Sequence, residues 1–382
     1  MEFIPYGLQW IDDDDINEVV NVLKSDWITT GPRIKEFEDA LCAYIGSQYC
    51  VAVNSGTSAL DIAVQSLEMP EGSEVITTPF TFVATSNAII YNGLKPVFAD
   101  ICRDTFNIDP VSIREKITKD TRAIIYVDYA GQPCDIKAIK EIAREFDLYL
   151  IEDACHGLGA EYEHKKAGNF ADLTIFSFHP VKHITTGEGG AVVTNNKELY
   201  EKLFLLRSHG IDKNTCDRYG PDAPWAYDMK YLGRNYRITD FQAALGISQL
   251  KKLETFIKRR QEIAKMYNEA FENIPKITSP AVRSNVRHVW HLYTILLDAK
   301  INRNKFFTYI RAKNIGVNLH YIPIYKFTYY QKNFSSKEEF PVTEEIFKRI
   351  ITLPLFPKMT DEKVINVIEA TKETIKNCKY GD

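Results

Sequence analysis

The chain has 382 residues, of which 45% are hydrophobic and 26% are charged, and its formal net charge is -4. The length predicts a large domain with a smaller one, and the charge gives no electrostatic reason to expect nucleic-acid or membrane binding. No apolar run approaches the roughly 18 residues that a membrane span needs, and the first residues lack the pattern of a signal peptide. The seven scattered Cys form no CxxC pair, which indicates reduced thiols in a cytoplasmic protein.

The first two thirds of the chain alternate strand and helix patterns. Seven short β-rich runs lie at residues 49–53, 75–78, 96–100, 123–128, 149–152, 173–178 and 191–194. Residues 58–67, 81–91 and 136–146 carry apolar side chains at helical spacing. This alternation predicts an α/β protein with a mostly parallel sheet that is covered on both faces.

A long helical pattern over about residues 240–274 leads into a smaller mixed C-terminal part. We therefore expect a large domain over residues 1–250, which includes an N-terminal arm at 1–32, and a small domain over residues 251–382. In parallel sheets, ligands bind at the carboxyl ends of the strands. The chemistry should accordingly lie just after each apolar run.

Residues 54–58, Asn-Ser-Gly-Thr-Ser, follow the first run and open a helix. A helix N-terminus presents free N–H groups and a positive dipole end, and both suit a phosphate group. Gly56 lets the backbone approach a ligand closely, and the hydroxyl of Thr57 can add a hydrogen bond. The alternative is a turn that is capped by these side chains and binds nothing.

Two ionisable residues follow later strands. Asp153 comes after the apolar run 148–151, where a carboxylate could pair with a protonated ring nitrogen or simply turn the chain. Lys182 follows the run 173–176 and is either a solvated surface charge or a covalent catalyst. Burial and nearby positive charge lower the pKa of a lysine from about 10.4 and make it a nucleophile. Together with the phosphate cradle, these residues supply the parts that pyridoxal phosphate (PLP) needs.

Two other signals favour different chemistry but are incomplete. Gly157 and Gly159 follow a strand, yet Tyr162 occupies the third glycine position of a dinucleotide fingerprint, which disfavours an NAD-dependent sugar dehydrogenase. His179 and His183 have the spacing of metal ligands on a helix, but Pro180 lies between them. We therefore predict no metal site.

The segment Ser177-Phe178-His179-Pro180-Val181-Lys182, followed by Thr-Thr-Gly-Glu-Gly-Gly at 185–190, resembles the lysine signature of the DegT/DnrJ/EryC1/StrS sugar aminotransferases. The resemblance extends through nearly the whole chain and includes residues 27–32, 55–60, 79–85, 152–154 and 235–237. It implies a PLP-dependent transferase fold of the aspartate-aminotransferase type, with a seven-stranded, mostly parallel sheet and a smaller C-terminal α+β domain. A PLP-dependent sugar dehydratase of this family would carry His in place of Lys182.

The resemblance also implies a role for individual residues. Lys182 would be the Schiff-base lysine that also moves the proton, and Asp153 would hold the pyridinium nitrogen. Phe82 would stack on the cofactor ring, and His156 would lie near its oxygen. The cofactor's phosphate would be bound by Gly56, Thr57 and Ser177, and by Asn235 from the other subunit of a homodimer with shared active sites.

Within the family, Asp128-Tyr129-Ala130-Gly131 and the segment 320–325 resemble the branch that acts in pseudaminic acid biosynthesis. This implies transfer of an amino group from glutamate to carbon 4 of a UDP-linked 4-keto-6-deoxy-N-acetyl hexose. The alternative is another UDP- or dTDP-linked keto sugar. The expected contacts with the nucleotide-sugar are Tyr6, Asp26, Trp27, Ile28, Thr29, His320, Tyr321, Ile322, Pro323 and Tyr325.

Overall fold

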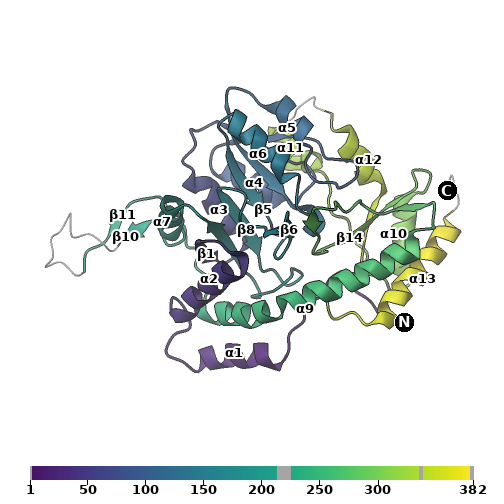
Figure 1. Ribbon diagram of the computed structural model, residues 1–382, viewed down its shortest axis with the longest axis horizontal. Helices are drawn as coiled ribbons and strands as arrows, with labels where there is room; N and C mark the ends of the chain where they lie inside the picture. The colour runs from purple at the N-terminus through teal and green to yellow at the C-terminus, as the bar shows by residue number, and fades with distance from the viewer. Residues whose placement is uncertain (1, 213–224, 335–338, 379–382) are drawn as a thin grey trace.

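A computed structural model describes residues 2–212, 225–334 and 339–378. Its centre is a seven-stranded sheet of order β1-β9-β8-β5-β4-β2-β3 (Figure 1). The strands are β1 (Tyr49–Val53), β2 (Glu74–Thr77), β3 (Lys95–Phe98), β4 (Thr121–Val127), β5 (Tyr149–Asp153), β8 (Leu173–Ser177) and β9 (Gly190–Thr194). Strand β9 is antiparallel to its two neighbours, and the other adjacent pairs are parallel. Each strand overlaps one predicted run, so the predicted mostly parallel α/β sheet is confirmed.

Helices cover both faces of this sheet. One face packs against α3 (Gly56–Ser66), α4 (Val83–Tyr91) and α7 (Lys197–Leu206). The other face packs against α2 (Pro32–Ile45), α5 (Pro110–Lys116), α6 (Ile136–Glu145) and the first half of α9 (Asp240–Phe271). Successive strand residues point to opposite faces, so Val51 joins the first core and its neighbours Cys50 and Ala52 join the second.

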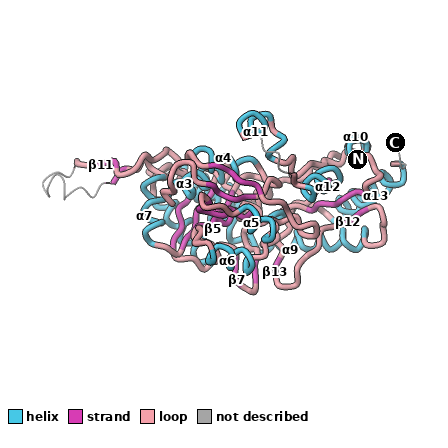
Figure 2. The backbone as a smooth tube through the Cα atoms, turned by 90° about the horizontal axis from the view of Figure 1, so that it is seen from above, coloured by secondary structure: helices cyan, strands magenta, loops and turns pink. Residues whose placement is uncertain are grey.

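The C-terminal part builds its own core around a three-stranded sheet. This sheet consists of β12 (Ile277–Thr278), β14 (Tyr293–Leu297) and β15 (Ile350–Leu353), and it packs with α10 (Arg303–Ala312), α13 (Asp361–Asn377) and the end of α9. Ile4 from the N-terminal arm lies in the same core, and its backbone N–H donates to the Asn314 carbonyl at 2.9 Å. Both chain ends lie beside this part (Figures 1 and 2).

The predicted domain boundary at residue 250 lies within α9. This helix packs against α1 (Asp13–Leu23) and α2 with its first half and contributes to the C-terminal core with its second half. One continuous helix therefore connects the two parts, and the exact division stays a prediction.

Shorter elements complete the description. They are β6 (Glu161–Tyr162), β7 (Lys165–Lys166), β10 (Ile211–Asp212), β11 (Asp228–Met229), β13 (Val286–Arg287), α11 (Thr328–Asn333), α12 (Pro341–Arg349), and the 3-10 turns η1 (Tyr129–Gly131) and η2 (Ile324–Lys326). Strands β10 and β11 project from one end of the molecule (Figure 1).

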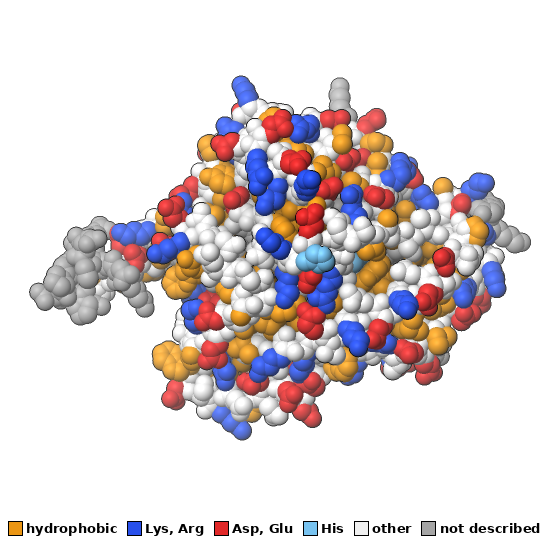
Figure 3. All heavy atoms as spheres, in the orientation of Figure 1, with side chains coloured by type: hydrophobic (Ala, Val, Ile, Leu, Met, Phe, Trp, Pro, Cys, Tyr) orange, Lys and Arg blue, Asp and Glu red, His pale blue; other side chains and the backbone are white. Residues whose placement is uncertain are grey.

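The surface and the cysteines agree with the composition. The face in Figure 3 carries acidic and basic side chains that are interspersed over it. None of the described helices is long and apolar enough to span a membrane. The described cysteines form no disulfide, and Cys216 lies outside the described residues.

Candidate active site

A cavity of about 880 Å³ lies at the carboxyl ends of the parallel strands. The sheet supplies one side of its wall, and residues 318–322 of the C-terminal part supply the other. The structure brings most of the predicted site residues together here. Those that line the cavity are Tyr6, Gly56, Thr57, Phe82, Asp153, His156, Ser177, Lys182, His320, Tyr321 and Ile322.

The predicted phosphate cradle is the N-terminus of α3. Ser55 caps the helix by accepting a hydrogen bond from the Ser58 N–H at 3.0 Å. A Cβ atom at residue 56 would lie 3.0 Å from Ser177 Cβ, which is tighter than ordinary contact, so glycine favours this close approach of the two segments. The capped helix start and the Thr57 and Ser177 side chains thus face one end of the cavity, where free N–H groups favour an anion.

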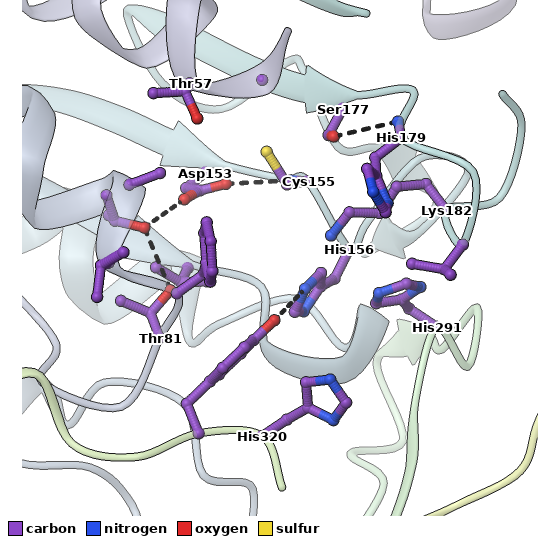
Figure 4. Close-up of a pocket in the computed structure, with 18 of the residues that line it drawn as sticks. Thr57, Thr81, Asp153, Cys155, His156, Ser177, His179, Lys182, His291 and His320 are labelled. Atoms are coloured by element: carbon purple, nitrogen blue, oxygen red, sulfur yellow. Dashed lines mark hydrogen bonds between the residues drawn. The ribbon is translucent and has the colours of Figure 1, made fainter. Parts of the chain in front are cut away.

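Asp153 is the last residue of β5 and is only 4% exposed. One carboxylate oxygen accepts a hydrogen bond from Thr85 Oγ1 at 2.7 Å, and the other accepts one from the Cys155 N–H at 3.2 Å (Figure 4). Thr85 Oγ1 also lies 3.2 Å from Thr81 Oγ1. These donors satisfy both carboxylate oxygens and hold the side chain in place at the cavity wall.

Lys182 reaches into the same cavity from the loop after β8 (Figure 4). Burial lowers the pKa of its ammonium group, and the charge of Arg260 acts in the same direction, whereas Asp153 and Cys155 oppose the shift. Within the described chain, its ammonium group has no hydrogen-bond or ion-pair partner. A lysine with a lowered pKa and no competing partner is suited to covalent chemistry with a carbonyl group.

Histidine rings form a further part of the cavity wall. His156 Nε2 lies 3.0 Å from the Tyr321 hydroxyl, and its ring packs on His291 with 4.2 Å between the ring centroids. Burial, followed by the charge of Lys182, lowers the pKa of His156 well below its usual range, so the ring is neutral. The buried Nδ1 atom of His156 has no partner in the described structure. It is thus available to a ligand.

Phe82 presents an aromatic surface to the cavity. It is the N-cap residue of α4 and is 57% exposed, although it lines a pocket wall. Its ring centroid lies 6.3 Å from that of Tyr321. The largely exposed ring of Phe82 therefore suits stacking with a planar ligand.

The other predicted residues lie outside this cavity in the single chain. Asp26, Trp27, Ile28 and Thr29 are on an exposed segment before α2, and Trp27 is 58% exposed. Asn235 is also exposed, in a bridge with Ser208. Pro323 is buried, and the Tyr325 hydroxyl donates to Glu344 at 2.8 Å. Their proposed contacts with ligands stay predictions, and for Asn235 they require a second subunit.

Two residues of the wall were not expected from the sequence. Thr85 was part of a recognised segment, but its bond to Asp153 joins residues 68 positions apart. His291 is not among the predicted site residues, yet it lines the cavity beside His156. The position of Thr85 one helical turn after Thr81 was the available signal.

Comparison with known proteins decides the family. Residues 9–372 match the family model described as DegT/DnrJ/EryC1/StrS aminotransferases. The chain belongs to this aminotransferase family. A Campylobacter jejuni relative named UDP-4-amino-4,6-dideoxy-N-acetyl-β-L-altrosamine transaminase is 41% identical over 99% of both chains. The solved structure of Helicobacter pylori PseC, described as an aminotransferase of pseudaminic acid biosynthesis, is 35% identical with a TM-score of 0.93 and covers 98% of this chain and 100% of its own.

A further solved structure bears on the cofactor. It is described as a sugar aminotransferase from Streptococcus pneumoniae in its PLP form, and it is 30% identical with a TM-score of 0.91 over 98% of this chain and 99% of its own. The predicted family, transferase fold and aminotransferase activity are confirmed.

The residues of this DegT-family chain fit PLP. The helix start at Gly56 matches its phosphate, the satisfied carboxylate of Asp153 matches a protonated ring nitrogen, and the exposed face of Phe82 matches its ring. His156, whose buried Nδ1 has no partner in the described structure, lines the same cavity as Lys182. When bound, PLP supplies an aldehyde that reacts with amines and a ring that accepts the electrons of a carbanion.

We expect Thr85→Val to slow the half-reaction with the amino donor about tenfold, because a hydrogen bond to a charged group is worth about 1.5 kcal/mol. Asp153→Asn should retain the cofactor and slow this step more, since a neutral amide does not stabilise a protonated ring nitrogen. Single-turnover absorbance measures both effects. Thr85→Ser keeps the hydroxyl and should behave like the wild type. An unchanged rate in Asp153→Asn would contradict the assignment of Asp153.

Lys182→Ala should abolish turnover and the absorbance of the covalently held cofactor, because the nucleophile and the proton carrier are removed together. Loss of the proton carrier alone should cost at least roughly 100-fold. The exposed Lys251 on α9 provides a control, and Lys251→Ala should keep both properties. Turnover in pure Lys182→Ala protein at the wild-type rate is the result that rules out this role.

Proposed function

We propose that this protein uses PLP to transfer an amino group from glutamate to the carbon-4 ketone of a UDP-linked 4-keto-6-deoxy-N-acetyl hexose, in pseudaminic acid or surface-glycan biosynthesis. The observation that carries the chemistry is the shared cavity of Lys182 and Asp153 at adjacent strand ends. The observation that supports the sugar is the 41% identity to a transaminase named for such a UDP-sugar, over 99% of both chains.

The roles of the catalytic residues follow from their surroundings. In the first half-reaction, Lys182 Nζ would take the proton from the α-carbon of glutamate and pass it to the cofactor, and its lowered pKa favours the free amine that this step needs. Asp153 keeps a proton on the ring nitrogen, and Thr85 holds the carboxylate in place. In the second half-reaction, Lys182 would take that proton back from the cofactor and deliver it to carbon 4 of the sugar, so that protons balance over the two-step exchange.

The cavity has room for a sugar beside the cofactor. Its volume of about 880 Å³ lies near the upper end of ordinary ligand pockets. Tyr6, His320, Tyr321 and Ile322 line the side that the sheet does not supply, and we assign them to the sugar. Aromatic and imidazole groups of this kind offer both flat surfaces and hydrogen-bonding atoms to a nucleotide-sugar.

Two segments noted in the sequence for the sugar assignment are in direct contact. The Tyr129 hydroxyl donates to the His320 carbonyl at 2.5 Å. The turn η1 therefore supports the backbone of the sugar-facing segment rather than touching the ligand cavity itself, since Tyr129 is 1% exposed. This contact couples the position of the sugar-facing segment to the turn after β4.

We further propose a homodimer in which each subunit completes the other's site. Asn235 and Trp27 are exposed and lie outside the cavity of their own chain, as residues that serve a neighbouring site would. Asn235 would then reach the phosphate bound by the partner chain.

The sugar assignment is tested by kinetics. Amination of the UDP-linked 4-keto sugar of L-altro type should show a higher kcat/KM than amination of the 4-keto epimer with D-xylo configuration or of dTDP-4-keto-6-deoxyglucose. The product is identified by NMR. A higher kcat/KM with either competitor overturns the choice of sugar and leaves the sugar-aminotransferase assignment in place.

The shared site is tested by subunit mixing. Lys182→Ala and Asn235→Ala homodimers should each be inactive or strongly impaired. Their heterodimer should contain one doubly defective and one intact site, so its activity should return to about half of the wild-type level, because one of its two sites is intact. Isolated heterodimers without recovered activity would show that the sites are not shared.

A further inference from the structure

A second group of carboxyl side chains lies behind the cavity wall. Asp128 follows β4, and Glu152 precedes Asp153 on β5. Because strand side chains alternate, Glu152 and its cross-strand partner Tyr126 point away from the face that carries Asp153, and Asp128 shares the face of Tyr126. Asp128, Glu152 and Tyr126 are all 0% exposed. Two carboxyl groups are therefore enclosed together directly behind the proposed cofactor site.

Each carboxyl group has donors for one oxygen only. Asp128 Oδ1 accepts from the Cys134 N–H at 3.1 Å. Glu152 Oε2 accepts from the Gly168 N–H at 2.8 Å and from Thr174 Oγ1 at 2.7 Å. The remaining oxygens, Asp128 Oδ2 and Glu152 Oε1, are buried without a hydrogen-bond partner in the described structure, and the Tyr126 hydroxyl beside Glu152 likewise has no partner at hydrogen-bonding geometry.

The two carboxyl groups lie within hydrogen-bonding reach of each other. Two carboxylates offer only acceptors, so they leave both facing oxygens unsatisfied unless one of them carries a proton. Two adjacent buried negative charges would also combine the cost of desolvation with mutual repulsion. Burial accordingly raises the pKa of both groups, and the charges of Glu152 and Asp153 raise that of Asp128 further.

We propose that Asp128 and Glu152 share one proton at neutral pH, so that the pair carries a single negative charge behind Asp153. The shared proton joins the two oxygens that have no other donor. No cationic side chain of the described residues forms an ion pair with either group, so a proton is the counter-charge that the structure allows.

The pair acts as a positioning device for Asp153. The Asp128 backbone N–H donates to the Asp153 carbonyl at 3.2 Å, which ties the end of β4 to the residue that faces the cofactor. With one charge instead of two behind it, Asp153 experiences less repulsion and keeps both oxygens as acceptors for Thr85 and Cys155. This inference concerns any substrate of the site and does not depend on the choice of sugar.

Infrared spectroscopy of the holoenzyme tests the proposal. The wild type should show the carbonyl stretching band of a buried protonated carboxyl group at neutral pH, and the band should shift in D2O. Asp128→Asn and Glu152→Gln should each lose the band, because each amide keeps the side-chain shape and donates an N–H in place of the shared proton. Asp61→Asn is the matched control, since the Asp61 carboxylate is buried but accepts from Asn92 and Tyr236.

Loss of the band in the two amide variants and its retention in Asp61→Asn supports the shared proton. Absence of the band from the wild type, or its survival in both amide variants, overturns the proposal. If one variant fails to fold, the other and the wild-type spectrum still decide between these outcomes.

A pH series provides a second readout on the same holoenzymes. A carboxyl pair that keeps a proton in the folded state binds one more proton than the unfolded chain above about pH 5, so its contribution to stability falls as pH rises. Between about pH 5 and pH 8, wild-type stability should therefore decline relative to Asp128→Asn with the slope of one proton. Parallel curves for the two proteins would contradict the shared proton.

Discussion

The site is organised around a buried carboxylate at the end of β5. Asp153 is almost inaccessible, and a buried charge is costly unless hydrogen-bond donors surround it. The Thr85 hydroxyl and the Cys155 N–H meet that requirement, and the Thr85 bond fixes the first turn of α4 against the sheet. Phe82 at the start of α4 is thereby placed on the same wall. Since β8 is the neighbour of β5 in the sheet, the loop after it brings Lys182 into the cavity.

Burial also determines the charge of the histidine rings that line the cavity. It lowers the pKa of His320 to about 3, and it moves the values of His156 and His291 well below their usual range, with Lys182 acting in the same direction. These rings are therefore neutral at physiological pH. A neutral imidazole donates through one nitrogen and accepts through the other, so His156 can bond the Tyr321 hydroxyl and still offer Nδ1 to a ligand. Lys182 and Asp153 then face a wall of uncharged polar groups.

The sequence was informative wherever a feature is local. Short β-rich runs located all seven strands of the sheet, and the rule that ligands bind at strand ends selected Asp153 and Lys182. Contacts between distant segments were inaccessible to this reasoning. The Thr85 bond to Asp153 and the packing of His291 on His156 depend on how separate loops meet. Contacts between two subunits, such as those proposed for Asn235, cannot be derived from local sequence patterns, and the structure of a single chain does not contain them.

The turn after β4 connects the chemistry of the sheet with the segment that faces the sugar. Gly131 has a φ of +96°, and a side chain there would lie 2.8 Å from the His156 carbonyl, so this close approach requires glycine. Two residues earlier, Tyr129 holds the His320 carbonyl. The position of His320 and Tyr321 thus depends on a contact with the turn after β4, where Asp128 also lies. A chimera that takes the segment 320–325 from a relative and keeps the rest of this chain would combine that segment with a supporting turn from a different sequence. The determinants of sugar choice in this family should therefore be sought in both segments together.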